Sequence, residues 1–195
     1  MGASNLLLTG SSGVGKSTVL CDLSRSLRHL KVRGFVSEVI WADERRLGWR
    51  LNGLSGGGGV FIHRDLRTPH RLGPYGVDLS VLNSLVEIEL VDVEVTDVYL
   101  IDEIGRACPM LPRFIETVTA LLDSPRTTVS IVHPTATGFA EQVRARDDVE
   151  LWSVTTENRD SLVEAMLQWG AGRPSESRTR VSLTPLRSAL SRTRG

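Results

Sequence analysis

The order of apolar and polar residues in the first part of the chain predicts two strands around a helix, followed by a further strand. The uninterrupted apolar run Leu6–Thr9 predicts a buried strand, and apolar residues at three- and four-residue spacings predict a helix over Lys16–Leu30. Gly34–Trp41 is rich in β-forming residues, Asp43-Glu44 favours a turn, and apolar residues alternate with polar or small ones over 46–52. We therefore expect an antiparallel hairpin over residues 34–52.

The rest of the pattern predicts a three-layer α/β domain. The expected helices are Val81–Leu90, Pro112–Leu122, Gly138–Arg146 and Arg159–Trp169, and the expected strands are Val98–Ile101, Thr127–Val132 and Val149–Val154. The continuous apolar run Val98–Ile101 is typical of a parallel strand covered on both faces. The regular alternation predicts a mainly parallel sheet with the hairpin as an antiparallel addition. The glycine-rich segment 53–59 is interpreted as a hairpin loop, because no helix follows it to complete a second phosphate cradle.

Composition divides the chain into a domain over residues 1–169 and an arginine-rich tail over 170–195. The tail holds six arginines and one glutamate, and its high content of Ser, Thr, Arg and Pro predicts flexibility. This skew toward arginine is not interpreted as a nucleic-acid signal, although the tail leaves contact with nucleic acid or an acidic partner open. Two cysteines are too few for a disulfide framework, and no apolar run has the roughly 18 residues of a membrane span. The early phosphate loop leaves no room for a signal peptide, so a cytoplasmic location is expected.

A phosphate-binding loop follows the first predicted strand. Its residues are Gly10, Ser11, Ser12, Gly13, Val14, Gly15, Lys16, Ser17 and Thr18. They match the pattern G-x-x-x-x-G-K-[ST], in which glycines let backbone N–H groups surround a polyphosphate and the next helix adds its positive N-terminus. In such a loop the lysine reaches the outer phosphates and the Ser17 hydroxyl can hold Mg²⁺. The loop predicts a nucleotide site in which Lys16 is catalytic.

Two adjacent carboxylates follow the apolar run Val98–Ile101. Asp102, at the carboxyl end of this strand, is expected to complete the Mg²⁺ site together with Ser17. Glu103 can orient and deprotonate an attacking water, which a hydrolase requires. The residues expected to border the nucleotide here are Val98, Tyr99, Leu100, Ile101, Asp102, Glu103, Ile104 and Gly105.

Together these segments resemble the P-loop nucleoside-triphosphatases of the THEP1 type. The matching segments are the phosphate loop, Gly34–Val39, Arg46–Trp49, Arg71–Asp78, Ile101–Gly105 and Glu157–Asp160, in the family order over residues 4–169. The resemblance implies a RecA-like parallel core and slow hydrolysis of ATP, GTP and other nucleoside triphosphates. The chain departs from the family after Gly105, where Arg106 stands in place of a lysine and Cys108 in place of an acid.

The transferring phosphoryl group requires a cation, and the arginines considered for this role are Arg71, Arg106 and Arg159. Arg71 and Arg106 are the better candidates for a catalytic role. Asn158 and Arg159 follow the last predicted strand and are candidates for contact with the base or ribose, the alternative for Asn158 being helix capping. His133 ends a predicted strand, but a structural role is expected for it.

Three functions remain open from the sequence. The leading prediction is Mg²⁺-dependent, weakly base-selective hydrolysis of nucleoside triphosphates. The alternatives are a kinase for a nucleotide or other small acceptor, with Glu38, Arg71 and residues 53–78 forming the acceptor pocket, and a nucleotide-dependent switch. The sequence does not determine the oligomeric state.

Overall fold

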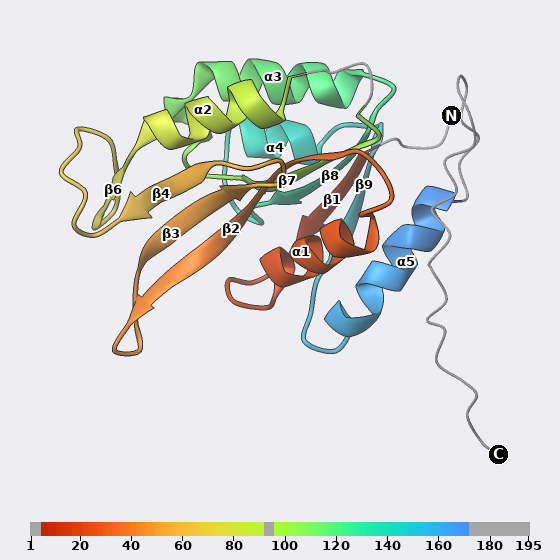
Figure 1. Ribbon diagram of the computed structural model, residues 1–195, viewed down its shortest axis with the longest axis horizontal. Coiled ribbons are helices and arrows are strands. Elements are labelled where there is room, and N and C mark those ends of the chain that lie inside the picture. The colour runs from red at the N-terminus through yellow and green to blue at the C-terminus, as the bar shows by residue number, and fades with distance from the viewer. Residues whose placement is uncertain (1–4, 92–95, 172–195) are drawn as a thin grey trace.

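The computed structural model describes residues 5–91 and 96–171, and these form one sheet between two layers of helices (Figure 1). The strands are β1 Asn5–Thr9, β2 Val32–Ala42, β3 Arg45–Gly53, β4 Gly58–His63, β5 Arg71–Leu72, β6 Tyr75–Val77, β7 Val98–Ile104, β8 Thr127–Val132 and β9 Val149–Ser153. The helices are α1 Lys16–Ser26, α2 Leu79–Glu89, the short 3₁₀ helix η1 Cys108–Met110, α3 Pro112–Asp123, α4 Phe139–Arg144 and α5 Arg159–Ala171. The first two residues of the predicted flexible tail, Gly170 and Ala171, belong to α5, and residues 172–195 lie outside the described residues.

The sheet has a parallel half and an antiparallel half. Within the described residues its order is β5-β6-β4-β3-β2-β7-β8-β1-β9. Strands β2, β7, β8, β1 and β9 run parallel, which confirms the predicted parallel core. The predicted hairpin is confirmed as β2 and β3, but the antiparallel half also contains β4, β6 and β5. Strand β8 separates the phosphate-loop strand β1 from β7, which carries Asp102 and Glu103.

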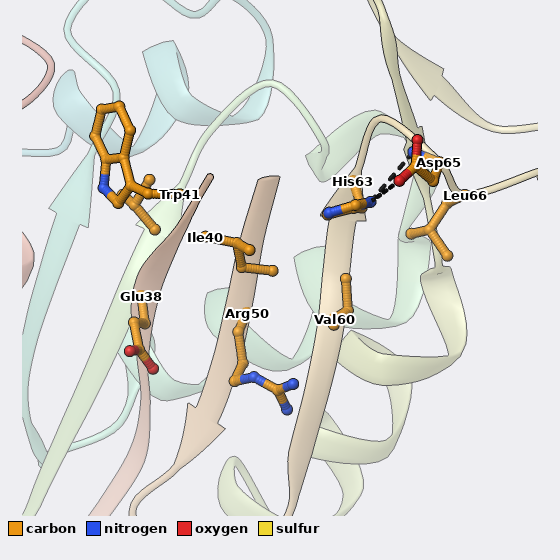
Figure 2. Close-up of a pocket in the computed structure, with 9 residues that line it drawn as sticks. Glu38, Ile40, Trp41, Arg50, Val60, His63, Asp65 and Leu66 are labelled. Atoms are coloured by element: carbon orange, nitrogen blue, oxygen red, sulfur yellow. Dashed lines mark hydrogen bonds and ion pairs between the residues drawn. The ribbon is translucent and has the colours of Figure 1, made fainter. Parts of the chain in front are cut away.

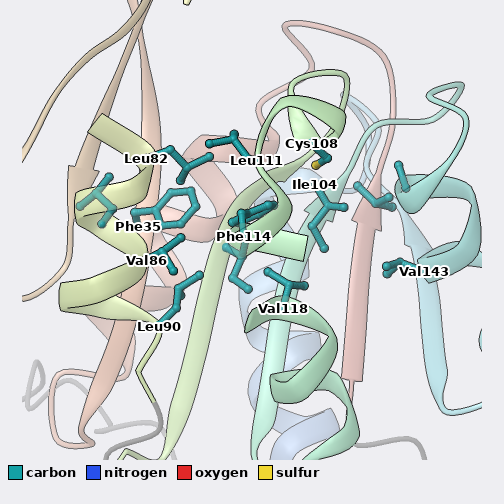
Figure 3. Packing of buried hydrophobic residues seen from close by; sticks show 14 of the residues in the cluster. Phe35, Leu82, Val86, Leu90, Ile104, Cys108, Leu111, Phe114, Val118 and Val143 are labelled. Atoms are coloured by element: carbon teal, nitrogen blue, oxygen red, sulfur yellow. The ribbon is translucent and has the colours of Figure 1, made fainter. Parts of the chain in front are cut away.

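Side chains of the central strands alternate between two cores. Leu6 and Leu8 of β1 pack with α1 and α5 on one face of the sheet, whereas Leu7 points to the other face. That second face is covered by α2, α3 and α4 (Figure 1). Its centre is the contact between Phe35 of β2 and Phe114 of α3, whose ring centroids lie 6.4 Å apart (Figure 3). Burial on both faces fixes the position of the strand ends, where the candidate site lies.

Two predicted element boundaries were wrong for identifiable reasons. The first helix was predicted to extend to Leu30 but ends at Ser26. Leu27 and Leu30 lie after the end of the helix, but both still pack into the core on the face of the sheet that α1 and α5 cover. The apolar pattern therefore continues beyond the helix itself. The strand predicted to end at Ile101 continues to Ile104, so Asp102 and Glu103 lie within β7 rather than after it.

Glu89 joins three parts of the fold and is fully buried. Its carboxylate accepts hydrogen bonds from the backbone N–H of Gly34 at 3.1 Å and from the N–H and hydroxyl of Ser55 at 2.8 and 2.6 Å. Gly34 has a φ of +123°, and a Cβ there would lie 1.8 Å from the carbonyl oxygen of Leu100. This close approach allows β2 to pair with β7, and Glu89 satisfies the N–H that it buries.

None of the helices within the described residues is both long enough and apolar enough to cross a membrane.

Candidate active site

The loop between β1 and α1 has the strand–loop–helix setting that its sequence predicts. Gly10, Gly13 and Gly15 have φ values of +148°, +80° and +106°, which L-residues rarely adopt. A Cβ on Gly10 would lie 2.5 Å from the carbonyl oxygen of Val154, so the loop approaches the end of β9 closely. Gly15 is the N-cap of α1, and the free N–H groups of the first helical turn therefore lie next to the loop. This arrangement suits an anionic ligand.

Lys16 places a positive charge on the first half of the loop. Its Nζ donates hydrogen bonds to the carbonyl oxygens of Gly10 and Ser11, both at 2.8 Å. The ammonium group and the α1 N-terminus therefore act on the same small volume.

A cluster of oxygen atoms lies beside the start of α1. Asp102 is 2% exposed, and its Oδ2 accepts hydrogen bonds from the backbone N–H of Ser37 at 2.9 Å and the Ser37 hydroxyl at 2.8 Å. The Ser17 hydroxyl lies 3.2 Å from that of Ser37. Burial raises the pKa of Asp102, while the hydroxyls of Ser17 and Ser37 and the charge of Lys16 oppose the rise. One carboxylate with two hydroxyls is an oxygen-only set that fits a hard divalent cation.

Glu103 follows Asp102 directly but has a different environment. The residue as a whole is exposed to solvent. Its carboxyl group, however, is largely surrounded by protein atoms, and this burial raises the pKa of Glu103 to about 7. The negative charge of Asp102 adds to this rise in pKa, and Lys16 and Arg106 oppose it. A Cβ on Gly105 would lie 2.8 Å from Glu103 Oε1, so the glycine provides the space that this carboxyl occupies. The pair thus consists of one buried, hydrogen-bonded carboxyl and one that reaches solvent.

The two carboxyls have three neighbours that bear on the site, and two of them, Arg106 and Cys108, are the positions where the chain departs from the family pattern. Arg106 is exposed and close enough to Glu103 and His133 to influence the pKa of both. His133 follows β8, its Nδ1 accepts from the N–H groups of Thr135 and Ala136, and burial followed by nearby cations lowers its pKa. Cys108 is buried in the α3 core, and its sulfur accepts a hydrogen bond from the N–H of Gly105 at 3.2 Å. Cys108 therefore packs beneath the site rather than pointing into it.

The two candidates for contact with the base or ribose, Asn158 and Arg159, have different surroundings. Arg159 lies against the loop, since a Cβ on Gly15 would be 3.3 Å from its Cδ. The Asn158 side chain is occupied in the turn after β9, where it accepts from the N–H of Thr155 and donates to the carbonyl of Ser153, both at 2.8 Å. The side chain therefore stabilises the turn before α5, and these two bonds do not cap the helix, because both partners precede Asn158 in the chain.

The structure does not bring Arg71 to the phosphate loop. It lies on β5 at the outer edge of the sheet, seven positions from β1 in the strand order, and donates to the carbonyl of Pro74 at 2.9 Å. Among the described residues no hydrogen bond joins Arg71 to the phosphate loop, and the catalytic role of Arg71 stays a prediction.

Arg46 is the residue that sequence reasoning missed. It lies in β3 near the hairpin turn, and its Nη1 is 3.3 Å from the Ser12 hydroxyl in the phosphate loop. The signal was present in the family-like segment Arg46–Trp49, but only the course of the hairpin shows that it reaches the loop.

A groove of about 590 Å³ lies on the antiparallel half of the sheet (Figure 2). Glu38 of β2 and Arg50 of β3 are register partners that both line this groove, and His63 and Asp65 line its far side. Glu38 therefore lies in a groove, as the acceptor-pocket hypothesis requires, but Arg71 is not among the residues that line it.

Comparison with known proteins supports one family. A family profile described as NTPase matches residues 5–167. The nucleoside-triphosphatase THEP1 of Thermotoga sp. (strain RQ2) is 32% identical over 163 residues, covering 83% of this chain and 92% of the relative. The human cancer-related nucleoside-triphosphatase is also 32% identical, covering 83% and 93%.

Two solved structures share the fold. The solution structure of a human cancer-related nucleoside triphosphatase superposes with a TM-score of 0.73 at 30% identity, covering 87% of this chain and 99% of that chain. The crystal structure of THEP1 from Aquifex aeolicus gives a TM-score of 0.74 at 24% identity, covering 85% and 98%. The predicted P-loop α/β fold is thereby confirmed.

Proposed function

Because this chain belongs to the NTPase family that includes the THEP1 nucleoside-triphosphatases, it is an enzyme of that activity, and we propose that it converts nucleoside 5′-triphosphates with Mg²⁺ to diphosphate and phosphate. The observation that carries this proposal is the pairing of Asp102 with Glu103 beside the phosphate loop. One carboxyl is buried among hydroxyls and suits a cation, and its neighbour reaches solvent and suits a water molecule.

The phosphate loop binds the triphosphate through its backbone N–H groups and the N-terminus of α1. Lys16 exchanges its hydrogen bonds to Gly10 and Ser11 for bonds to the outer phosphate oxygens. Ser17 and Asp102 would hold Mg²⁺, with the Ser37 hydroxyl orienting the Asp102 carboxylate. The ion, when bound, neutralises charge on the phosphate oxygens.

Glu103 acts on the attacking water. The water oxygen forms a bond to the terminal phosphorus as the bond from that phosphorus to the bridging oxygen breaks, and the nucleoside diphosphate leaves with the electron pair. Glu103 accepts the proton that the water loses. Its position over Gly105, with access to solvent, supports this role.

Base selectivity is expected to be weak. The chain has no N-K-x-D segment to read guanine, and the Asn158 amide is engaged in its own turn. Arg159 can contact ribose or base without distinguishing purines. ATP and GTP should therefore be hydrolysed within about tenfold of each other, or roughly 1.4 kcal/mol.

The test is phosphate release by the purified protein from ATP, GTP, CTP and UTP, each with Mg²⁺ and with EDTA. Release in the absence of any acceptor, abolished by EDTA, is the expected result. Diphosphate formation only when a nucleotide or other hydroxyl acceptor is added would instead establish the kinase alternative, for which the groove around Glu38 and Arg50 is the candidate acceptor site. Stimulation only by a protein partner would favour the switch.

A further inference from the structure

Arg46 reaches the phosphate loop from the β2–β3 hairpin. The hairpin extends past the region where β2 pairs with β7, which covers only Val32–Phe35 of β2. At its end Arg46 pairs with Trp41, and its Nη1 lies 3.3 Å from the hydroxyl of Ser12. Lys16 bonds to Gly10 and Ser11 in the same loop, so two cations meet the loop at consecutive residues.

A ring of stacked side chains holds Arg46 in this position. Its guanidinium lies over Trp49, 4.8 Å from the ring centroid, and Trp49 packs edge-on against Tyr75 at 5.2 Å. The guanidinium of Arg64 covers Tyr75 at 5.0 Å, and Arg64 Nε donates to the Arg46 carbonyl oxygen at 3.4 Å. Aromatic stacking orients the planar guanidinium while leaving its N–H groups available.

The charge of Arg46 is not neutralised by the protein around it. In the part of the chain that the structure describes, no carboxylate lies within ion-pair distance of its guanidinium. Its Nε is buried and lacks a hydrogen-bond acceptor among the described residues. An arginine has five donors, and a buried one without a partner calls for an explanation. A phosphate group on the loop would supply the missing negative charge and could accept hydrogen bonds from the Nη groups, which already approach Ser12.

We propose that Arg46 is a catalytic arginine finger supplied from within the chain, which contacts the terminal phosphoryl group and stabilises the charge that develops during transfer. Trp49 is the positioning residue that aims it. This inference rests on the proposed hydrolysis of nucleoside triphosphates. It also replaces the sequence-based candidates, since Arg71 is bound at the opposite edge of the sheet and Arg106 has no contact with the loop among the described interactions.

The first experiment compares Arg46→Ala with Arg45→Ala in steady-state hydrolysis and in nucleotide binding by calorimetry. Arg45 is the matched control because it removes the same charge from the same hairpin, and it is exposed. Arginine fingers contribute about 10³–10⁵-fold to kcat in other P-loop enzymes. We expect Arg46→Ala to lower kcat by at least about 10²-fold while the Kd for Mg-ADP changes less than about threefold, and Arg45→Ala to resemble the wild type.

A second measurement isolates the transition state. Mg-ADP with aluminium fluoride mimics the transferring phosphoryl group, and the wild type should bind this combination more tightly than Mg-ADP alone. Arg46→Ala should lose that gain, and Arg46→Lys should recover little of it because an ammonium cannot form the same fork of bonds or stack on Trp49. Thermal melting of each variant verifies that it is folded.

Trp49→Phe and Trp49→Leu test the positioning role. The ring of phenylalanine keeps a face for the guanidinium, so we expect Trp49→Phe to retain most of the wild-type kcat and Trp49→Leu to lose about tenfold, both with little change in KM.

The outcomes separate the two proposals. If the wild type releases no phosphate from any nucleotide, the hydrolase function itself is wrong. If the wild type is active and Arg46→Ala retains kcat within threefold, the finger is wrong while the hydrolase function stands. Equal losses in Mg-ADP affinity and kcat would also overturn the finger, because Arg46 would then bind ground state and transition state alike.

Discussion

Replacing Glu103 by glutamine tests the proposed division of labour between the two adjacent carboxyls. Glutamine has nearly the same shape, so the space above Gly105 stays filled and the cluster of Asp102, Ser17 and Ser37 is left intact. The substitution removes the ability to accept a proton from water, together with the negative charge of the carboxylate. General-base catalysis contributes about 10²–10⁴-fold, which corresponds to roughly 2.7–5.5 kcal/mol of activation free energy. We expect kcat to fall within this range.

In the Glu103→Gln enzyme, the affinity for nucleotide should increase or stay the same. Glu103 and Asp102 are close enough that the charge of Asp102 raises the pKa of Glu103, so the triphosphate approaches two like charges. Removing one of them relieves repulsion and leaves the metal ligands in place. Asp102→Asn is the contrasting variant, because it alters the buried oxygen cluster and should weaken binding of the Mg²⁺ complex as well as turnover.

The assay is phosphate release combined with calorimetric titration of Mg-nucleotide for the wild type and both variants. A Glu103→Gln enzyme that turns over within threefold of the wild-type rate would refute the reasoning, because another group would then activate the water. A Glu103→Gln enzyme that loses nucleotide binding in parallel with turnover would also refute it, since Glu103 would then belong to the binding site.

Three further variants test other parts of the structure. Lys16→Ala should lower kcat by on the order of 10²-fold or more through lost stabilisation of phosphoryl charge, measured by phosphate release at saturating nucleotide. Glu89→Ala should lower the free energy of unfolding by about 2–5 kcal/mol, measured by urea denaturation, because it leaves the buried N–H of Gly34 without an acceptor. Phe114→Ala, at a fully buried position against Phe35, should cost about 3–5 kcal/mol in the same assay.

The parallel half of the fold could be read from the sequence because its signals are local. The run Val98–Ile101 is continuous since both faces of β7 are covered, and Gly10–Gly15 is recognisable by spacing alone. Burial patterns of this kind depend on one strand and its two helical layers. Asp102 and Glu103 were identified for the same reason, although the strand that carries them is three residues longer than predicted.

The antiparallel half could not be read in this way. Strand β4 begins inside the glycine-rich segment, and β5 and β6 contain two and three residues, too short for any periodicity. Glu89 ends a helix whose sequence gives no hint that its carboxylate serves two backbone N–H groups on other elements. Such bonds depend on which segments lie side by side, and that is a property of the whole fold.

The exchange of Arg71 for Arg46 as the candidate cation follows from the same limit. Both arginines lie in family-like segments, and nothing local distinguishes them. The pairing of β2 with β3 shifts register between Ile40 and Trp41, which sets Arg46 opposite Trp41 near the end of the hairpin. A register shift of one residue would reverse the face on which the following side chains lie. Whether this arginine meets the phosphate loop is therefore decided by the irregularity in the hairpin, which only the three-dimensional structure reveals.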